Sequence, residues 1–164
     1  MSAEQNLKKL NINLPKAPDP VGAYVASKIV GNLIFISGQL PLDSEGKLIK
    51  GKVGKELSLE QGQECAKFCA LNLLAQLKKI SGSLDKVKGC VKITGYVNSI
   101  DSFVDQPKVI NGASDLISKI FGDKGKHTRA AVSVNSLPLG AAIAVPYTHL
   151  RANETEADVV CRLL

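Results

Sequence analysis

The segment from His127 to Val145, HTRAAVSVNSLPLGAAIAV, carries the residue pattern best suited to ligand chemistry. Its single arginine, Arg129, opens an alternating apolar run, which is typical of a strand with one face against a core. A guanidinium held at a strand end predicts an anion site, although a surface ion pair would explain the same residue. LPLG at residues 137–140 interrupts the run and residues 141–145 resume it, so we expect two adjacent or kinked parts of one sheet.

The elements before this segment follow from apolar spacing and turn residues. Residues 1–20 show little periodicity and predict an extended arm. AYVASKIV and LIFIS flank Gly31-Asn32, which predicts a β-hairpin with a two-residue turn. Ser58 followed three residues later by Gln61 is a capping-box signature, so a helix is expected from about residue 58 to residue 80. That helix is apolar on more than one side, which indicates a neighbouring helix or an oligomer contact.

A strand and a second helix come next. Residues 87–97, VKGCVKITGYV, alternate as a strand does, and Gly95 among them predicts a bulge. DQP at residues 105–107 suits a helix start, and Gly122 stops the apolar stripe of that helix. Two long helices on one face of a mixed sheet predict a two-layer α+β domain.

The composition limits the classes of function. A chain of 164 residues that is 45% hydrophobic favours one domain with a substantial core. The net charge of +6 is spread over lysine singles and pairs with few aromatic residues among them, so we expect no specific nucleic-acid partner. The four cysteines lack zinc spacing and are expected to be reduced thiols. No apolar run is long enough for a membrane span or a signal peptide, so a soluble cytoplasmic protein is expected.

Four motifs carry a family resemblance when they are taken together. They are GxY at residues 22–24, SGQ-P at 37–41, DQPKVINGASDL at 105–116 and R-x-A-V-x-V-x-x-LPLGAA at 129–142. From about residue 14 to residue 145 the chain resembles the longer branch of the RidA/YjgF family, imine deaminases once called L-PSP endoribonucleases. The resemblance implies a chorismate mutase-like fold and a homotrimer with ligand clefts between subunits. It also implies hydrolysis of short-lived enamines or imines, such as 2-aminoacrylate, to a 2-keto acid and ammonia, with no metal or organic cofactor.

The same resemblance implies the site residues. Arg129 matches the arginine that binds the substrate carboxylate, and Tyr24, Ser37, Gly38 and Asn111 match positions that line the cleft. From the residues alone, Gly38 after a strand would let a ligand approach the backbone, and Asn111 beside an apolar stripe could face a ligand. Structural alternatives exist for each: Tyr24 as a core aromatic, Ser37 as a strand-end hydrogen bond, Gly38 as a simple strand exit and Asn111 as a solvated helix residue.

Two parts of the site depart from the family pattern. Ala131 stands where the better-studied branch has a cysteine, which excludes thiol chemistry there. Ala144 and Pro146 stand where glutamates are usual, and the first of these glutamates is the one that positions the attacking water. Because proline cannot donate to a sheet ladder, we expect the last strand to stop near Val145.

The tail at residues 147–164, YTHLRANETEADVVCRLL, does not match the family. It is similar to the peptide obtained when sequencing-adapter DNA is translated at the end of a truncated reading frame. A natural tail is the alternative, because Asn153 could cap a helix whose apolar residues recur at positions 157, 160, 161 and 164. The expected organisation is an arm at residues 1–20, a family-like domain at 21–146 and a tail at 147–164.

Three functions are compatible with these observations. The first is enamine or imine deaminase-like hydrolysis of an intermediate whose carboxylate Arg129 binds. The second is a trimeric module that binds small acids without turnover, which Ala144 favours. The third, RNA binding or endoribonuclease activity, rests on the net charge and on the older name of the family.

Overall fold

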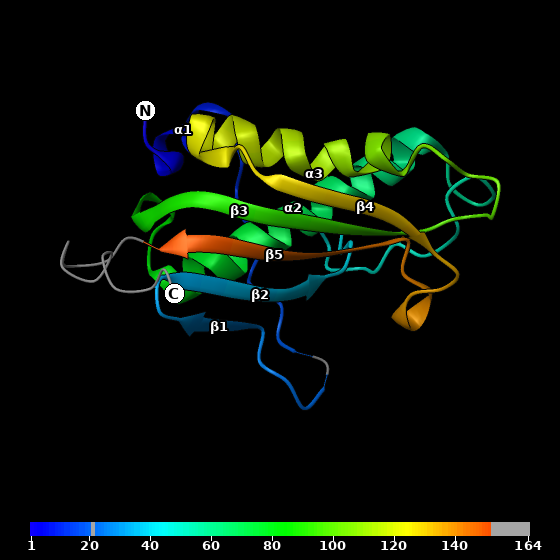
Figure 1. Ribbon diagram of the computed structural model, residues 1–164, viewed down its shortest axis with the longest axis horizontal. Helices are drawn as coiled ribbons and strands as arrows, with labels where there is room; N and C mark the ends of the chain where they lie inside the picture. The colour runs from blue at the N-terminus through cyan, green and yellow to red at the C-terminus, as the bar shows by residue number, and fades with distance from the viewer. Residues whose placement is uncertain (21, 152–164) are drawn as a thin grey trace, which may run out of the picture.

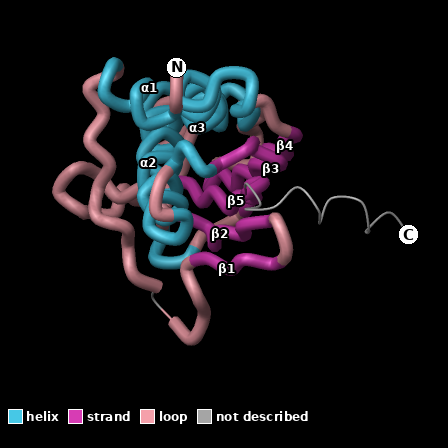
Figure 2. The backbone as a smooth tube through the Cα atoms, turned by 90° about the vertical axis from the view of Figure 1, so that its left-hand side faces the viewer, coloured by secondary structure: helices cyan, strands magenta, loops and turns pink. Residues whose placement is uncertain are grey.

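The protein forms two layers, a five-stranded sheet and a layer of helices on one of its faces (Figure 1, Figure 2). The computed structural model describes residues 1–20 and 22–151. The helices and strands are α1 (Ala3–Lys9), β1 (Ser27–Val30), β2 (Leu33–Gln39), α2 (Leu59–Ser81), β3 (Val87–Asn98), α3 (Gln106–Phe121), β4 (Thr128–Val134) and β5 (Ile143–Arg151). Short 3₁₀ turns lie at Leu84–Lys86, Gly122–Gly125 and Pro138–Gly140. The predicted α+β class, with a mixed sheet and two long helices on one face, is confirmed.

The strand order separates the two halves of the segment that contains Arg129. The sheet runs β1-β2-β5-β3-β4, with β3 and β4 parallel and the other pairs antiparallel. The two parts of the segment therefore belong to one sheet, as expected, but they are not adjacent, because β3 lies between β4 and β5. The reason is topological: α3 carries the chain from β3 across to a parallel β4, as a parallel pair requires, and the other edge of β3 stays available for β5.

The hairpin and both long helices match the predictions. Gly31 begins the turn between β1 and β2 with a φ of 56°, a conformation that glycine adopts without steric cost. The Ser58 hydroxyl accepts from the Gln61 amide, and the Gln61 side chain accepts from the Ser58 amide, which completes the capping box of α2. The additional apolar surface of α2 packs against α3 within the same chain, so a neighbouring helix accounts for it.

Glycines allow α3 to approach both of its neighbours closely. A Cβ atom added to Gly112 would lie 2.0 Å from the backbone oxygen of Gln63 in α2. A Cβ added to Gly95 of β3 would lie 2.3 Å from the side chain of Ile110. The prediction of a bulge at Gly95 is wrong, because the pairing of β3 with β4 is regular from Lys92 to Asn98. Gly95 instead provides the space into which Ile110 packs.

The N-terminal segment is not uniformly extended. Residues Ala3–Lys9 form α1, which starts at a capping box between Ser2 and Gln5 and buries Ala3 and Leu7. The prediction of an extended arm therefore fails for its first half. The missed signal was a serine followed three residues later by glutamine, the same pattern that predicted α2.

The last described strand continues beyond Pro146, against expectation. β5 pairs with β2 on one side and β3 on the other as far as residues 150–151. The pairing with β2 shifts between Ile36, opposite Tyr147, and Gln39, opposite Val145, which places an extra residue in β2 opposite Pro146. A bulge is where a strand tolerates a residue that cannot donate a ladder hydrogen bond. Residues 152–164, including the helix considered for the tail, lie outside the described part of the chain.

The core lies between the sheet and the two long helices. Its fully buried large side chains come from both layers and include Ile34, Leu73, Leu77, Ile93, Ile117 and Ile143. Within residues 1–20 and 22–151, no helix is long and apolar enough to cross a membrane.

Candidate functional site

Arg129 lies near the start of β4, on the side of the sheet that carries the helices. Its partner in the parallel ladder is Ile93, which is fully buried against the helices. The Nη1 group of Arg129 donates to Asn111 Oδ1 at 2.7 Å and to Ser114 Oγ at 3.2 Å. These two acceptors stand one turn apart on α3. The structure therefore brings together Arg129 and Asn111, two of the five predicted site residues.

The guanidinium of Arg129 keeps donors for a ligand. Arginine has five N–H groups, and the hydrogen bonds to α3 use only those of Nη1. Among the described residues, the Nε and Nη2 groups have no hydrogen-bond partner, and the side chain is exposed. These two nitrogens form the edge that binds a carboxylate through two parallel hydrogen bonds.

A serine and a histidine extend this network, and the sequence did not point to them. His127 Nε2 lies 3.0 Å from Ser114 Oγ, and His127 Nδ1 lies 2.6 Å from the carbonyl oxygen of Gly125. Nδ1 must donate to that carbonyl, so Nε2 of the neutral ring accepts from the Ser114 hydroxyl, which in turn accepts from Arg129. The available signals were spacing alone: His127 lies two residues before Arg129, just ahead of β4, and Ser114 follows Asn111 by three residues on a helix.

The other three predicted residues lie together elsewhere in the fold. Tyr24 precedes β1 with half of its surface exposed, and it lines a cavity of about 170 Å³ together with Gly38 and Leu139. The Ser37 hydroxyl donates to the carbonyl of Val25 at 2.8 Å, which is the structural role considered for it. Ser37 and Gly38 are also the residues of β2 that stand at the bulge opposite Pro146.

The two groups are separated across the sheet in a single chain. Arg129, Ile93, Tyr147 and Ile36 are successive partners across β4, β3, β5 and β2. Three strand spacings place the ends of this row roughly 14 Å apart. One chain therefore does not assemble all five predicted residues into one site.

The positions that depart from the family hold no reactive group. Ala144 is 8% exposed in β5 and stands opposite Tyr96 of β3.

Burial raises the pKa of the Cys65 thiol to about 11 and that of the Cys90 thiol to about 12. Such thiols stay protonated at neutral pH and are poor nucleophiles. Within the described residues, no group of three or more His, Cys, Asp or Glu could hold a metal ion.

Comparison with known proteins identifies the class. A family model described as "YjgF/chorismate mutase-like, putative endoribonuclease" matches residues 4–150, and the chain belongs to this RidA/YjgF family. Protein TCP17 of Trypanosoma cruzi is 44% identical over 141 residues, covering 85% of this chain and 88% of that protein. The 2-iminobutanoate/2-iminopropanoate deaminase of Rattus norvegicus is 31% identical over 140 residues, covering 82% and 84%.

A solved structure confirms the chorismate mutase-like fold. The crystal structure of a putative endoribonuclease from Shewanella oneidensis MR-1 superposes with a TM-score of 0.88 at 31% identity, covering 92% of this chain and 99% of that one. The family match also covers residues 147–150, the first four residues of the predicted tail. The interpretation of the tail as adapter-derived has no support from these comparisons.

Proposed function

We propose that the protein hydrolyses enamines or imines derived from 2-amino acids and that Arg129 binds the substrate carboxylate. Water adds to the imine carbon and ammonia leaves, so that an imino acid becomes a 2-keto acid. The observation that carries the proposal is the guanidinium held by Asn111 and Ser114 through Nη1 while Nε and Nη2 stay available. The family relationship to an imine deaminase supports the same chemistry.

We further propose that the complete site forms between subunits of a homotrimer. In this arrangement the Arg129 and Asn111 group of one subunit meets the Tyr24, Ser37 and Gly38 group of its neighbour. The separation of the two groups across one sheet supports this proposal. Light scattering after size exclusion should give a mass three times that of the chain, and a monomeric active protein would contradict the shared site.

Binding without turnover is the second candidate, and Ala144 favours it. The described strand β5 offers no carboxylate at this position to activate water, so a bound acid could remain unreacted. In the deaminase proposal, water is instead polarised by polar groups that line the assembled cleft. Restoring the acid with Ala144→Glu separates the candidates: acceleration indicates a working hydrolase, whereas binding with no turnover in either form indicates a binding module.

The decisive measurement is 2-keto acid release from freshly generated 2-aminoacrylate. Charge-assisted hydrogen bonds contribute about 1.5–3 kcal/mol each, so the loss of two of them in Arg129→Ala should lower kcat/KM by roughly 100-fold or more. Arg129→Lys keeps the positive charge but cannot form the bidentate pair of hydrogen bonds, so its kcat/KM should lie between those of Arg129→Ala and wild type. Equal rates for wild type and Arg129→Ala would reject the assigned role. Ribonuclease activity that persists through purification and depends steeply on salt concentration would instead support RNA binding or endoribonuclease activity as the function.

A further inference from the structure

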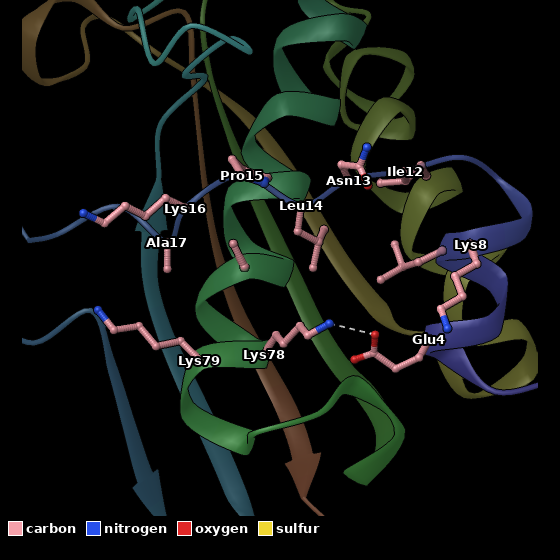
Figure 3. A pocket seen from close by; sticks show the side chains of 12 residues that line it. Glu4, Lys8, Ile12, Asn13, Leu14, Pro15, Lys16, Ala17, Lys78 and Lys79 are labelled. Carbon is pink, nitrogen blue, oxygen red and sulfur yellow. Dashed lines mark hydrogen bonds and ion pairs between the residues drawn. The ribbon is translucent and has the colours of Figure 1, made fainter.

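A second cavity lies on the helix layer, away from Arg129. It has a volume of about 570 Å³, is open to solvent, and is lined by α1, the segment at residues 12–17 and the C-terminal half of α2 (Figure 3). Ligand pockets in proteins typically have volumes of about 300–1,000 Å³, so a small organic molecule fits this space. The proposed imine chemistry uses none of the residues that line it.

The floor of this pocket is apolar. Leu7 of α1 and Ala75 of α2, which are 4% and 6% exposed, line it together with the half-buried side chains of Ile12 and Leu14. Figure 3 shows Leu14 and Ile12 in the segment that passes over α2. A ligand with a hydrocarbon or aromatic body would cover the parts of Ile12 and Leu14 that remain exposed to water, which is favourable in proportion to the apolar area covered.

The rim is strongly positive. Lys8, Lys16, Lys78 and Lys79 line the pocket with a single glutamate, Glu4. Lys78 pairs with Glu4 at 2.8 Å, and Lys79 lies 3.6 Å from Asp19. Within residues 1–20 and 22–151, Lys8 and Lys16 have no ion-pair partner. Two lysines are therefore available to an anion.

The wall formed by α1 is held in place by the protein itself. The Glu4 amide donates to Asp85 Oδ1 at 3.0 Å, and Glu4 Oε1 accepts from the Leu84 amide at 3.1 Å. Asn6 Nδ2 donates to the carbonyl of Ile120 at 2.8 Å. These contacts join α1 to α3 and to the turn before β3, so the pocket does not need a ligand to form.

We propose that this pocket binds a small organic anion with an apolar body. The acidic group lies at the lysine rim and the body lies on the floor of Leu7, Leu14 and Ala75. A peptide partner fits less well, because stable protein interfaces cover about 800 Å² on each side and this apolar floor consists of a few side chains. The site is independent of the imine chemistry and would let a second metabolite bind to the same subunit.

Fluorescence titration with 8-anilinonaphthalene-1-sulfonate tests the proposal, because this probe joins an aromatic body to one anionic group. Each exposed charge contributes modestly, so Lys8→Gln and Lys16→Gln should each weaken probe binding about two- to fivefold, and the double variant roughly tenfold. The larger single effect identifies the end of the pocket that holds the acid. Ala75→Leu should weaken binding at unchanged charge, because it fills the floor with a residue that suits a helix.

The controls distinguish binding in the pocket from nonspecific binding of the probe elsewhere on the protein. The double variant Lys28→Gln/Lys47→Gln removes the same charge from residues outside the pocket and should bind as wild type does. Sulfate and the neutral probe N-phenyl-1-naphthylamine should both bind more weakly than the anionic probe. The proposal would be overturned if the pocket variants and the control variant bound the probe with equal affinity. It would also be overturned if sulfate, at the same concentration as the probe, displaced the probe completely. Circular dichroism and thermal melts verify folding, and the lysine variants remain decisive if Ala75→Leu fails to fold.

Discussion

His149 makes the stability of the fold depend on pH, and the size of the effect can be worked out from its surroundings. The side chain is fully buried in β5, where its ring contacts Tyr147 and Phe121 at centroid distances of 4.0 and 5.5 Å. Nδ1 donates to the carbonyl of Gly89 at 3.0 Å, and among the described residues Nε2 has no partner. Burial lowers the pKa of His149 from 6.5 to about 3. The folded protein therefore holds this ring neutral.

The direction of the effect follows from proton binding. Between pH 6.5 and 3 the unfolded chain binds a proton at His149 that the folded chain does not, so acid favours unfolding. Stability from this residue is fully present above pH 6.5 and is lost as the pH falls towards 3. At about 1.4 kcal/mol per pH unit, lowering the pH from 7.5 to 4.5 should cost roughly 3 kcal/mol. For a domain of this size that corresponds to a fall in Tm of about 6–12 °C.

A matched variant isolates this contribution from that of the carboxylates. His149→Gln stays neutral and can still donate to Gly89, so it should lose about 3 kcal/mol less than wild type over the same interval. Urea unfolding at both pH values measures the difference. The chain has only two histidines, so the NMR signal that disappears in the variant belongs to His149. That signal should not titrate between pH 7.5 and 4.5; a midpoint near 6.5, or identical pH dependence of both proteins, would refute the reasoning.

Three further changes test the packing by urea or thermal unfolding. Gly112→Ala should destabilise by roughly 1–3 kcal/mol although alanine favours helices, since the new Cβ would lie 2.0 Å from a backbone oxygen of α2. Gly62→Ala is the milder control, because its Cβ would meet only the side chains of Val53 and Val109, the nearest atom at 3.2 Å, and an equal cost would argue against the close crossing. Gly95→Ala should cost a similar 1–3 kcal/mol, and adding Ile110→Ala should recover part of it; strict additivity would contradict their contact. Ser58→Ala should cost about 1 kcal/mol by removing the helix cap, and no change would mean that the capping box is dispensable.

Local patterns predicted the elements well because the physics that specifies them is local. The capping box at Ser58 and the turn at Gly31 each depend on a few neighbouring residues, and both formed as expected. The strand order was harder to predict from the sequence, because the position of β4 beside β3 depends on where α3 packs. Proline suggested a strand end at Pro146, but the compensating bulge lies in β2, more than a hundred residues earlier.

The candidate site was only partly predictable from the sequence, because some of its contacts depend on how distant elements pack. Arg129 and Asn111 share a motif-based prediction and a hydrogen bond. Ser114 and His127 support the same guanidinium, yet neither has an unusual residue type or spacing. Tyr24, Ser37 and Gly38 stay predictions for an assembled site, because the bulge and the hydrogen bond to Val25 already explain two of them structurally.

The position of β5 also governs the order in which the sheet can be completed during synthesis. β5 lies in the middle of the sheet, with β2 on one side and β3 on the other, but it is the last described strand to leave the ribosome. Until then the β1–β2 hairpin and the β3–α3–β4 unit each present an open strand edge. Such edges pair readily with other chains, and pairings distant in sequence form slowly. The sheet is therefore completed only when β5 inserts between two strand edges that are synthesised before it.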